Sequence, residues 1–348
     1  MRTDFAPQAA WFKYGKSESA LNSTVNTTDI LAGPSGSFTA QVGGLEENTT
    51  YYYKAYMKVW NGSTYVEIES PMVGTFTTLA STVPSGETLN ADWMELPASP
   101  SLLGNRKLVT MRGTMNGKDT RNYSILYDPQ YYAATWVAFN YCKAHRGSGS
   151  MSSWYENPQI ASNLQVEPSY PSGYDRGHQI PNALRNGETS MQKQTYYYTN
   201  STPQLKDFNQ KIWANLETAE RNIIDNSTAA ATDTLYIVTG PVYKTVGGNE
   251  SVSTFTTGGK SVSVPNYYYR VILKVRRGSS GTVTAASAIG FWMPHDADTG
   301  ADDYTKYACT VDSIEEKTGF DFFANLPPSV ESTAEANDSW TMFKNYSF

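Results

Sequence analysis

The sequence predicts an α+β protein with a small all-β unit at its N-terminus. Its 348 residues correspond to about two domains, of which the larger can bury a full core. Residues 1–80 contain short β-rich runs and no helical period, whereas the rest of the chain combines long strand candidates with two helical segments. Long strands with few helices between them favour α+β over a doubly wound parallel sheet.

Composition excludes several classes of protein. The 27 Lys and Arg against 33 Asp and Glu give a formal net charge of -6, which argues against coating nucleic acid through bulk electrostatics. No stretch approaches the ~18 to 20 consecutive apolar residues of a membrane span. The two cysteines, Cys142 and Cys309, are too few for a disulfide scaffold, and their pairing is left open.

The N-terminal unit is expected over residues 1–80 as a β-sandwich. In the tyrosine-rich run 50–56, alternate side chains lie on opposite faces, as a strand of a sandwich requires. Residues 43–53 and 74–78 resemble the last strands of a fibronectin type III domain, and the first two strands of that fold are missing. The strand candidates are 10–14, 37–42, 49–59 and 73–78.

A linker of small residues is expected at 81–88, followed by a second domain at 89–348. The helical segments of this domain are 207–225, where apolar residues recur at helical spacing, and 311–318, which ends before a glycine. The apolar strand candidates, which we expect at the centre of the sheet, are 133–141, 235–239, 267–275 and 285–292.

Only three histidines are available as general bases at neutral pH. His178 follows Asp175, Arg176 and Gly177 and precedes Pro181, which indicates a loop or hairpin, where catalytic groups concentrate. Arg176 supplies a planar cation that suits a phosphate oxygen. The alternative is a structural histidine in a turn beside a surface arginine.

The helix expected at 207–225 presents a second polar group. Asn209, Glu217 and Arg221 lie eight and four residues apart, within about 120° of arc at ~100° per residue. Apolar residues occupy the other side, so one face packs and the other carries an amide, a carboxylate and a guanidinium. An ordinary solvated face with an i,i+4 ion pair is the alternative.

Together these motifs resemble the DNA/RNA non-specific endonuclease family, the ββα-metal nucleases of the endonuclease G type. The resemblance covers roughly residues 90–335. It rests on ordered motifs at matching spacing, at 175–178, 199–204, 208–210, 213–221, 239–243, 291–294 and 311–319.

The resemblance implies roles for individual residues. His178 falls on the general base of the family, and Asn209 on its one direct protein ligand to Mg²⁺, with Mn²⁺ or another divalent cation as alternatives. A single neutral amide oxygen is plausible because Mg²⁺ keeps most of its waters. The remaining matches are Asn200 beside the base, Glu217 as the carboxylate that orders water around the ion, and Arg176 and Arg221 as phosphate-facing arginines.

One position departs from the family pattern. The family often has a further arginine about thirty residues before the histidine motif, and matching on Trp154 puts Ser152 at that place. Arg146 or Lys143 is expected to substitute, or else the role is lost.

The other two histidines are weaker candidates for a functional role. His145 is either a loop residue or a substrate contact. His295 is expected in a surface loop rather than in a second metal site, because only two carboxylates accompany it. Strand packing is favoured over base stacking for the tyrosine runs 196–198 and 267–269.

The resulting function is metal-dependent hydrolysis of DNA and RNA, which are held through their backbone phosphates, with 5′-phosphate products. The alternatives are a DNA-restricted nuclease and a weak or inactive nuclease-like protein that binds nucleic acid or a surface. The presence of both the base and the metal ligand favours the enzyme. Action outside the cell, at its surface or in the periplasm, is expected because an unregulated nuclease would harm its own cell.

Overall fold

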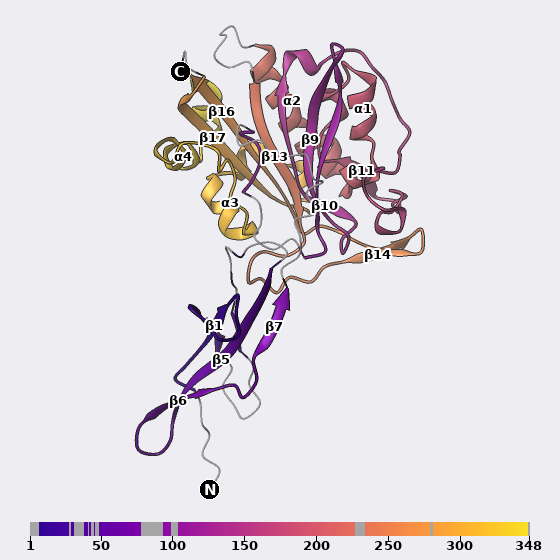
Figure 1. Cartoon of the computed structure of the whole chain (residues 1–348). Helices are drawn as coiled ribbons and strands as arrows, with labels where there is room; N and C mark the ends of the chain where they lie inside the picture. The colour runs from indigo at the N-terminus through magenta and orange to yellow at the C-terminus, as the bar shows by residue number, and fades with distance from the viewer. Residues whose placement is uncertain are drawn as a thin grey trace. The chain divides into compact units, whose positions relative to one another are not determined.

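A computed structural model of the chain describes residues 7–27, 29–30, 38–40, 42, 45, 49–77, 93–98, 104–226, 234–278 and 281–346. The chain divides into two compact units, Met1–Gly86 and Glu87–Phe348 (Figure 1). The linker expected at 81–88 lies outside the described residues.

The described part of the N-terminal unit is all β and antiparallel. Its long central strand β5 pairs with three others, and Tyr51 on β5 is buried and stacks on Phe76 with ring centroids 5.7 Å apart. The likeness to a fibronectin type III domain stays a prediction. The strands are β1 (Ala9–Gly15), β2 (Ser23–Asn26), β3 (Asp29–Ile30), β4 (Phe38–Thr39), β5 (Thr50–Trp60), β6 (Tyr65–Glu69) and β7 (Gly74–Thr77).

The second unit is built on a seven-stranded antiparallel sheet in the order β18-β17-β16-β13-β10-β9-β8. The four apolar strand candidates form the adjacent strands β17, β16, β13 and β10, which confirms the α+β prediction. The strands are β8 (Lys107–Met115), β9 (Lys118–Asp128), β10 (Ala133–Cys142), β13 (Thr234–Val242), β16 (Tyr267–Arg277), β17 (Val283–Pro294) and β18 (Ala308–Cys309).

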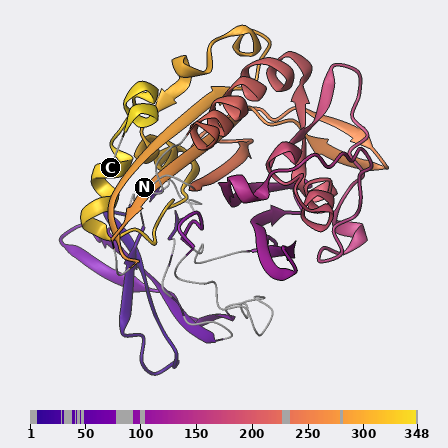
Figure 2. The ribbon, with the colours of Figure 1, turned by 90° about the horizontal axis from the view of Figure 1, so that it is seen from above.

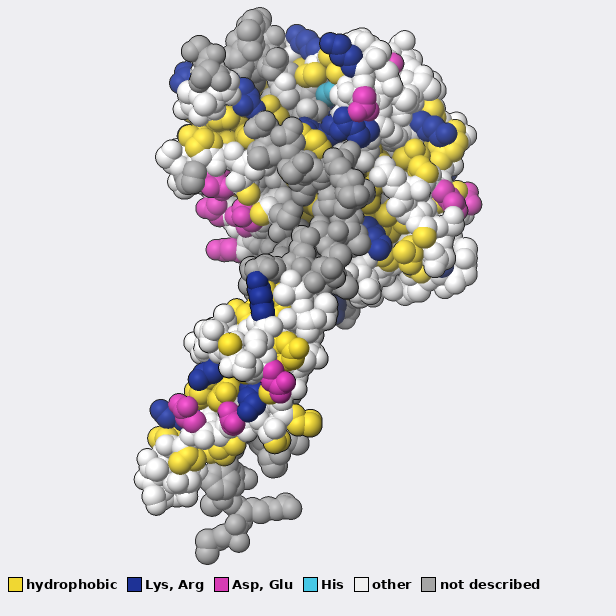
Figure 3. Space-filling view, viewed as in Figure 1, with side chains coloured by type: hydrophobic (Ala, Val, Ile, Leu, Met, Phe, Trp, Pro, Cys, Tyr) yellow, Lys and Arg dark blue, Asp and Glu magenta, His cyan; other side chains and the backbone are white. Residues whose placement is uncertain are grey.

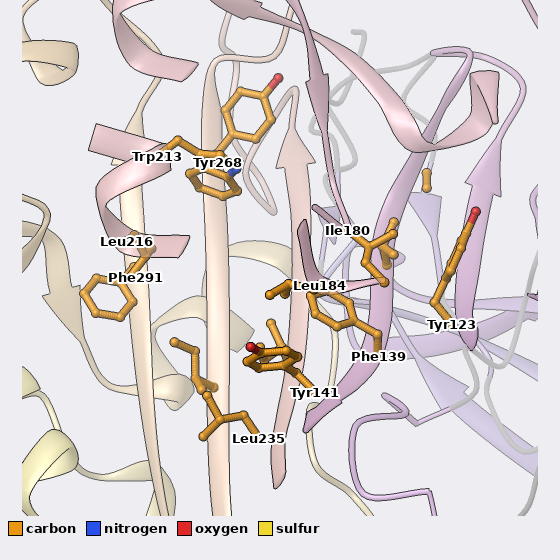
Figure 4. Close-up of a cluster of buried hydrophobic side chains, with 14 of the residues drawn as sticks. Tyr123, Phe139, Tyr141, Ile180, Leu184, Trp213, Leu216, Leu235, Tyr268 and Phe291 are labelled. Carbon is orange, nitrogen blue, oxygen red and sulfur yellow. The ribbon is translucent and has the colours of Figure 1, made fainter. Parts of the chain in front are cut away.

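Helices cover both faces of this sheet (Figures 1 and 2). Alternate residues of β16 enter two different cores: Ile272 packs in the core that contains Leu216 of α2, and Val271 packs in the core that contains Ile314 of α3. Figure 4 shows part of the first core. The helices are α1 (Thr189–Thr195), α2 (Ala214–Asp225), α3 (Val311–Thr318), α4 (Pro328–Glu335) and α5 (Trp340–Asn345).

The helix expected at 207–225 forms in two parts. A π-helical turn, η5 (Phe208–Trp213), leads directly into α2. Buried residues then recur every four positions through Leu216, Glu220 and Ile224. Ala219 and Ile223, which the sequence pattern also places on the packed face, are partly buried and pack against the same core. The pattern did not predict that Glu220 is buried as well.

A two-stranded sheet precedes η5, and it is formed by β11 (Tyr174–His178) and β12 (Ser201–Leu205). The order β11, β12, η5 and α2 is a ββα arrangement. A second small sheet pairs β14 (Thr254–Thr257) with β15 (Lys260–Ser263). The 3₁₀ turns are η1 (Lys143–His145), η2 (Ser162–Leu164), η3 (Asn182–Leu184), η4 (Tyr198–Asn200), η6 (Thr299–Ala301) and η7 (Tyr304–Tyr307).

None of the helices in the described part of the chain combines the length and apolar character needed to cross a membrane.

Candidate active site

The Asp-Arg-Gly-His motif forms strand β11 and pairs in register with β12, so that His178 faces Ser201 and Gly177 faces Thr202. A Cβ atom added to Gly177 would lie 2.2 Å from Oε1 of Gln204. Gln204 is 1% exposed, so its buried side chain would have to shift to admit that atom. The hairpin therefore favours glycine immediately before the histidine.

The imidazole of His178 lies in an aromatic environment. Its ring centroid is 4.7 Å from the ring of Trp154 and 4.9 Å from that of Tyr196, which meets it edge-on. Burial, followed by the positive charge of Arg176, lowers the pKa of His178 to about 4, so the ring is neutral at physiological pH. Among the described residues Nε2 has no hydrogen-bond partner, which leaves its lone pair available to accept a proton.

Arg176 lies two residues before His178 on the same strand, and its side chain is exposed. Its guanidinium carbon is 5.8 Å from the centroid of the Trp154 ring. Trp154 thus contacts both the histidine and the arginine. In the sequence, Trp154 served only to align the chain with the family pattern, and no role in the site was predicted for it. An exposed guanidinium held beside a neutral histidine can contact an anionic substrate.

Asn209 is joined to the hairpin by a hydrogen bond. Its amide Nδ2 donates to Oδ2 of Asp175 at 3.0 Å, and Gln210 Nε2 donates to the same oxygen at 2.7 Å. Both amides come from the π-helical turn η5, and π turns are frequent at functional sites. In the described part of the chain, no protein group binds the amide oxygen of Asn209. Nothing in the sequence predicted that Asp175 accepts hydrogen bonds from Asn209 and Gln210.

Glu217 lies further along, in the first turn of α2. Burial raises the pKa of Glu217 to about 7; Glu220 adds to the rise, whereas Arg270 and Arg221 oppose it. Behind it, the fully buried side chains of Glu220 and Arg270 form a two-point ion pair at 2.5 and 2.7 Å. Glu217 therefore titrates near neutrality beside a fixed buried pair that the sequence did not reveal.

Arg221 follows Glu217 by one helical turn and is partly exposed. Its Nη2 donates to Thr218 Oγ1 at 2.6 Å. Among the described residues Arg221 and Glu217 form no ion pair, so the i,i+4 pair of an ordinary solvated helix face is absent. The Arg221 guanidinium is therefore not held in an ion pair with Glu217.

Asn200 is fully buried, and its amide is committed to the backbone. Oδ1 accepts from Ile180 N at 3.0 Å, and Nδ2 donates to Ile180 O at 3.0 Å and to Thr195 O at 2.7 Å. These bonds fix the chain two residues after His178. The structure thus brings His178, Arg176, Asn200 and Asn209 together around one hairpin, and it places Glu217 and Arg221 further along α2.

Lys143 and Arg146, which we expect to substitute for the missing arginine, lie in and directly after η1, and a role for either stays a prediction. Arg146 forms an ion pair with Asp225 at the end of α2, and Lys143 is exposed in η1. Ser152 is exposed, two residues before the Trp154 ring that contacts His178.

His145 lies in the short 3₁₀ turn that follows β10, and its burial argues against contact with a substrate. It is 5% exposed in η1, and its Nδ1 lies 3.3 Å from Cys142 N and 3.4 Å from Arg185 Nη1. His295 lies in irregular backbone directly after β17, as expected, but its side chain is only partly exposed. His295 Nε2 accepts from Leu205 N at 2.8 Å, and its Nδ1 lies 2.9 Å from Pro265 O.

Cys142 and Cys309 are both free thiols, so the question of their pairing is settled. The run 267–269 lies in strand β16 as expected, whereas Tyr196–Tyr198 does not form a strand. Tyr196 instead contacts His178.

Comparison with known proteins places these residues in a family. The model of the DNA/RNA non-specific endonuclease family matches residues 106–329. A nuclease of Serratia marcescens is 29% identical over 67% of this chain and 80% of its own length, and a nuclease of Nostoc sp. is 29% identical over 62% and 75%. Mitochondrial endonuclease G of Bos taurus is 27% identical over 66% of this chain and 77% of its own.

A solved structure agrees on the fold. The crystal structure of a complex between EndoG and its inhibitor EndoGI contains a chain that matches with a TM-score of 0.51 at 20% identity, over 63% of this chain and 90% of that chain. The family match spans the ββα hairpin, η5 and α2, which carry the candidate residues. The chain therefore belongs to the DNA/RNA non-specific endonuclease family and is an endonuclease.

Proposed function

We propose that this endonuclease hydrolyses phosphodiester bonds of DNA and RNA with His178 as general base and one Mg²⁺ ion held by Asn209, and that it leaves 5′-phosphate ends. The observation that carries the proposal is the hydrogen bond from Asn209 to Asp175. Asp175 lies three residues before His178 on β11, so one short strand orients both the base and the amide.

The Asn209 side chain fits a Mg²⁺ ion. An ionised carboxylate only accepts hydrogen bonds, so the amide nitrogen faces Asp175 and the amide oxygen is left for a cation. Mg²⁺ prefers oxygen ligands and retains several waters, so few protein ligands suffice; Mn²⁺ suits the same oxygen ligands. When bound, the ion would neutralise negative charge that develops on the leaving 3′ oxygen.

His178 is suited to remove a proton from the attacking water. Its lowered pKa keeps the imidazole neutral, and the unpartnered Nε2 offers the lone pair that accepts the proton. The aromatic rings of Trp154 and Tyr196 hold the ring in place and limit access of other water.

The remaining candidate residues bind the substrate or orient water and the backbone. Arg176 and Arg221 would hold phosphate oxygens of the substrate through charge-assisted hydrogen bonds. Glu217 would order water near the reacting phosphate. Asn200 acts through the backbone next to His178 and is a positioning residue.

The proposed catalytic and binding residues act on phosphate groups and water, and none of their roles requires a 2′-hydroxyl on the substrate. Cleavage of both DNA and RNA follows, with weak sequence preference. One observation favours the competing candidate, a catalytically weak nuclease-like binding protein: exposed Ser152 occupies the place of the missing arginine.

The test is digestion of supercoiled plasmid and of structured RNA in Mg²⁺, with and without EDTA, followed by ligation of the products. EDTA-sensitive cleavage of both substrates, with DNA ends that ligate without prior phosphorylation, is the expected result. Binding without cleavage under several divalent metals would favour the competing candidate. Products that ligate only after 3′-phosphate removal and 5′ phosphorylation would exclude the proposed chemistry.

We also propose that the enzyme acts outside the cell, at its surface or in the periplasm. A nuclease without sequence preference would degrade the nucleic acids of its own cytoplasm. Activity confined to the cytosolic fraction of the producing cell would contradict this location.

A further inference from the structure

A group of carboxylates lies on the face of the sheet opposite to α2. Helix α3 carries Asp312 and Glu315, three residues apart, and α4 carries Glu331 and Glu335, four residues apart. Residues of α3 and α4 pack in the second core of the sheet, away from the hairpin and η5. Figure 3 shows acidic side chains gathered over this region. Like charges at these spacings destabilise a helix unless a cation compensates them.

Three of these carboxylates converge. One oxygen each from Asp312, Glu315 and Glu335 lie within 4.8 Å of one another. Ca²⁺ binds oxygen at 2.3–2.6 Å, so two ligands on opposite sides of the ion are ~4.6 to 5.2 Å apart. The three oxygens are therefore close enough to reach one Ca²⁺ ion.

Glu335 provides an independent indication of a missing partner. Its side chain is 5% exposed, and its Oε1 has no hydrogen-bond partner among the described residues. A buried carboxylate without a partner is costly. In the described part of the chain, no Lys or Arg forms an ion pair with Asp312, Glu315 or Glu335.

The surroundings of this group carry the same sign of charge. Two further acidic side chains, Glu331 and Asp321, lie near Glu335. Glu315 has one firm partner, because its Oε1 accepts from Phe322 N at 2.6 Å. One backbone hydrogen bond therefore fixes Glu315, whereas no Lys or Arg among the described residues pairs with the three carboxylates.

We propose that Asp312, Glu315 and Glu335 form a Ca²⁺ site that joins α3 to α4. The ligands are carboxylate oxygens without histidine or cysteine, which argues against a site built for zinc or copper. Three carboxylates from two helices suit the flexible coordination of Ca²⁺ better than the strict octahedron of Mg²⁺. The site is structural, and it is separate from the Mg²⁺ that we assign to Asn209.

The test is calorimetric titration of the metal-free full chain with CaCl₂ at pH 8, where protons compete less for the carboxylates. The chains to compare are the unmodified protein, Glu335→Gln, Asn209→Ala and Glu316→Gln. Glu316 is an exposed carboxylate on the same helix, so its variant is the matched control. We expect one Ca²⁺ site that survives in Asn209→Ala and Glu316→Gln and is lost in Glu335→Gln.

Thermal unfolding keeps the proposal falsifiable if binding heats are small. A 100-fold excess of Ca²⁺ over its Kd is expected to raise the Tm of the unmodified protein by about 5 to 10 °C. Glu335→Gln is expected to match the Tm of the unmodified protein in EDTA, because glutamine keeps the size and shape of the glutamate side chain, and to lose the response to Ca²⁺. A Ca²⁺ response that persists in Glu335→Gln, or one that only Asn209→Ala removes, would overturn the proposal.

Discussion

The carboxylate of Asp175 accepts hydrogen bonds from Asn209 and Gln210 through a single oxygen. Asp175 thereby holds the amide of Asn209 in the one orientation that frees its oxygen for a cation. The groups behind a metal ligand fix its direction and affect its affinity. At the residue scale, Asp175 is the positioning residue of the proposed metal site.

Replacing Asp175 by Ala should therefore weaken the response to metal. We expect the Mg²⁺ concentration for half-maximal activity to rise by about 10- to 100-fold, because the Asn209 amide loses its orientation. The measurement is a Mg²⁺ titration of plasmid cleavage at constant ionic strength.

Asp207→Ala is the matched control for this titration. Asp207 is an exposed carboxylate two residues before Asn209 and pairs with Lys211 at 2.9 Å. Equal increases in the Mg²⁺ concentration for half-maximal activity in both variants would mean that any acidic residue near η5 has this effect. That result would contradict a specific positioning role for Asp175.

His145 gives a second prediction at the residue scale. Burial, followed by the charges of Arg185 and Arg121, lowers the pKa of His145 to about 3, well below the ~6.5 of an unfolded chain. As pH falls below about 6.5, the unfolded state binds a proton that the folded state does not, so the free energy of unfolding decreases. The loss from this residue reaches about 1.4 kcal/mol per pH unit until the pH approaches its folded pKa.

Chemical denaturation of the unmodified protein and of His145→Gln between pH 8 and pH 4 measures this contribution. We expect the stability advantage of the unmodified protein to be constant above pH 7 and to shrink as pH falls towards 4. An advantage that grows in acid would show that His145 is stabilised in its charged form.

At the element scale, the β11–β12 hairpin leaves no room for a side chain at Gly177. The added Cβ would overlap the buried side chain of Gln204. Overpacking of this kind costs about 1 to 3 kcal/mol. It also moves the strand that carries His178 and Arg176.

Gly177→Ala should therefore reduce both the free energy of unfolding and kcat. The double variant Gly177→Ala with Gln204→Ala removes the overlapping atoms and should recover part of both losses. A double-mutant cycle on denaturation and cleavage checks the coupling. Purely additive effects would mean that the two side chains do not compete for the same space.

The sequence predicts the central elements of the fold well and its polar elements poorly. Strands β10, β13, β16 and β17 are apolar on both faces, so their composition alone indicates buried strands. The edge strand β8 and the hairpin strands β11 and β12 carry many polar residues and give no such pattern. The helical period of the sequence covers both the π turn and α2, but it does not distinguish a π turn from an α-helix.

The candidate site shows the same division. Family motifs locate His178 and Asn209, whereas the contacts that orient them come from Asp175, Trp154 and Tyr196. The Glu220–Arg270 pair joins residues 50 positions apart. A glutamate in a helical pattern indicates a solvated face, so only the folded chain reveals that Glu220 is buried.

At the scale of the whole molecule, the net charge of -6 limits how nucleic acid is held. A few placed cations, rather than a broad basic surface, must provide the contacts with phosphate. With Arg176 and Arg221 as the phosphate ligands, the binding constant for duplex DNA should fall with salt on a log–log slope of about -1.8, at ~0.9 per phosphate.

Arg176→Ala should reduce that slope by about 0.9, because one phosphate contact is lost. Binding to a short duplex in Ca²⁺ or EDTA, over a range of NaCl concentrations, measures the slope without cleavage. Arg112→Ala, at a partly exposed arginine on the edge strand β8, is the control. A slope near -6 or steeper would indicate a broad electrostatic interface and contradict a site of few contacts.

The most direct test of the account is chemical rescue of His178→Ala. The variant is expected to lose at least about 100-fold in kcat while it keeps its folded spectrum and its affinity for DNA. Added imidazole should restore part of the rate in proportion to its neutral fraction, because a free base can then enter the vacated space beside Trp154 and Tyr196. Cleavage by His178→Ala at the unmodified rate, without imidazole, would show that His178 is not the general base.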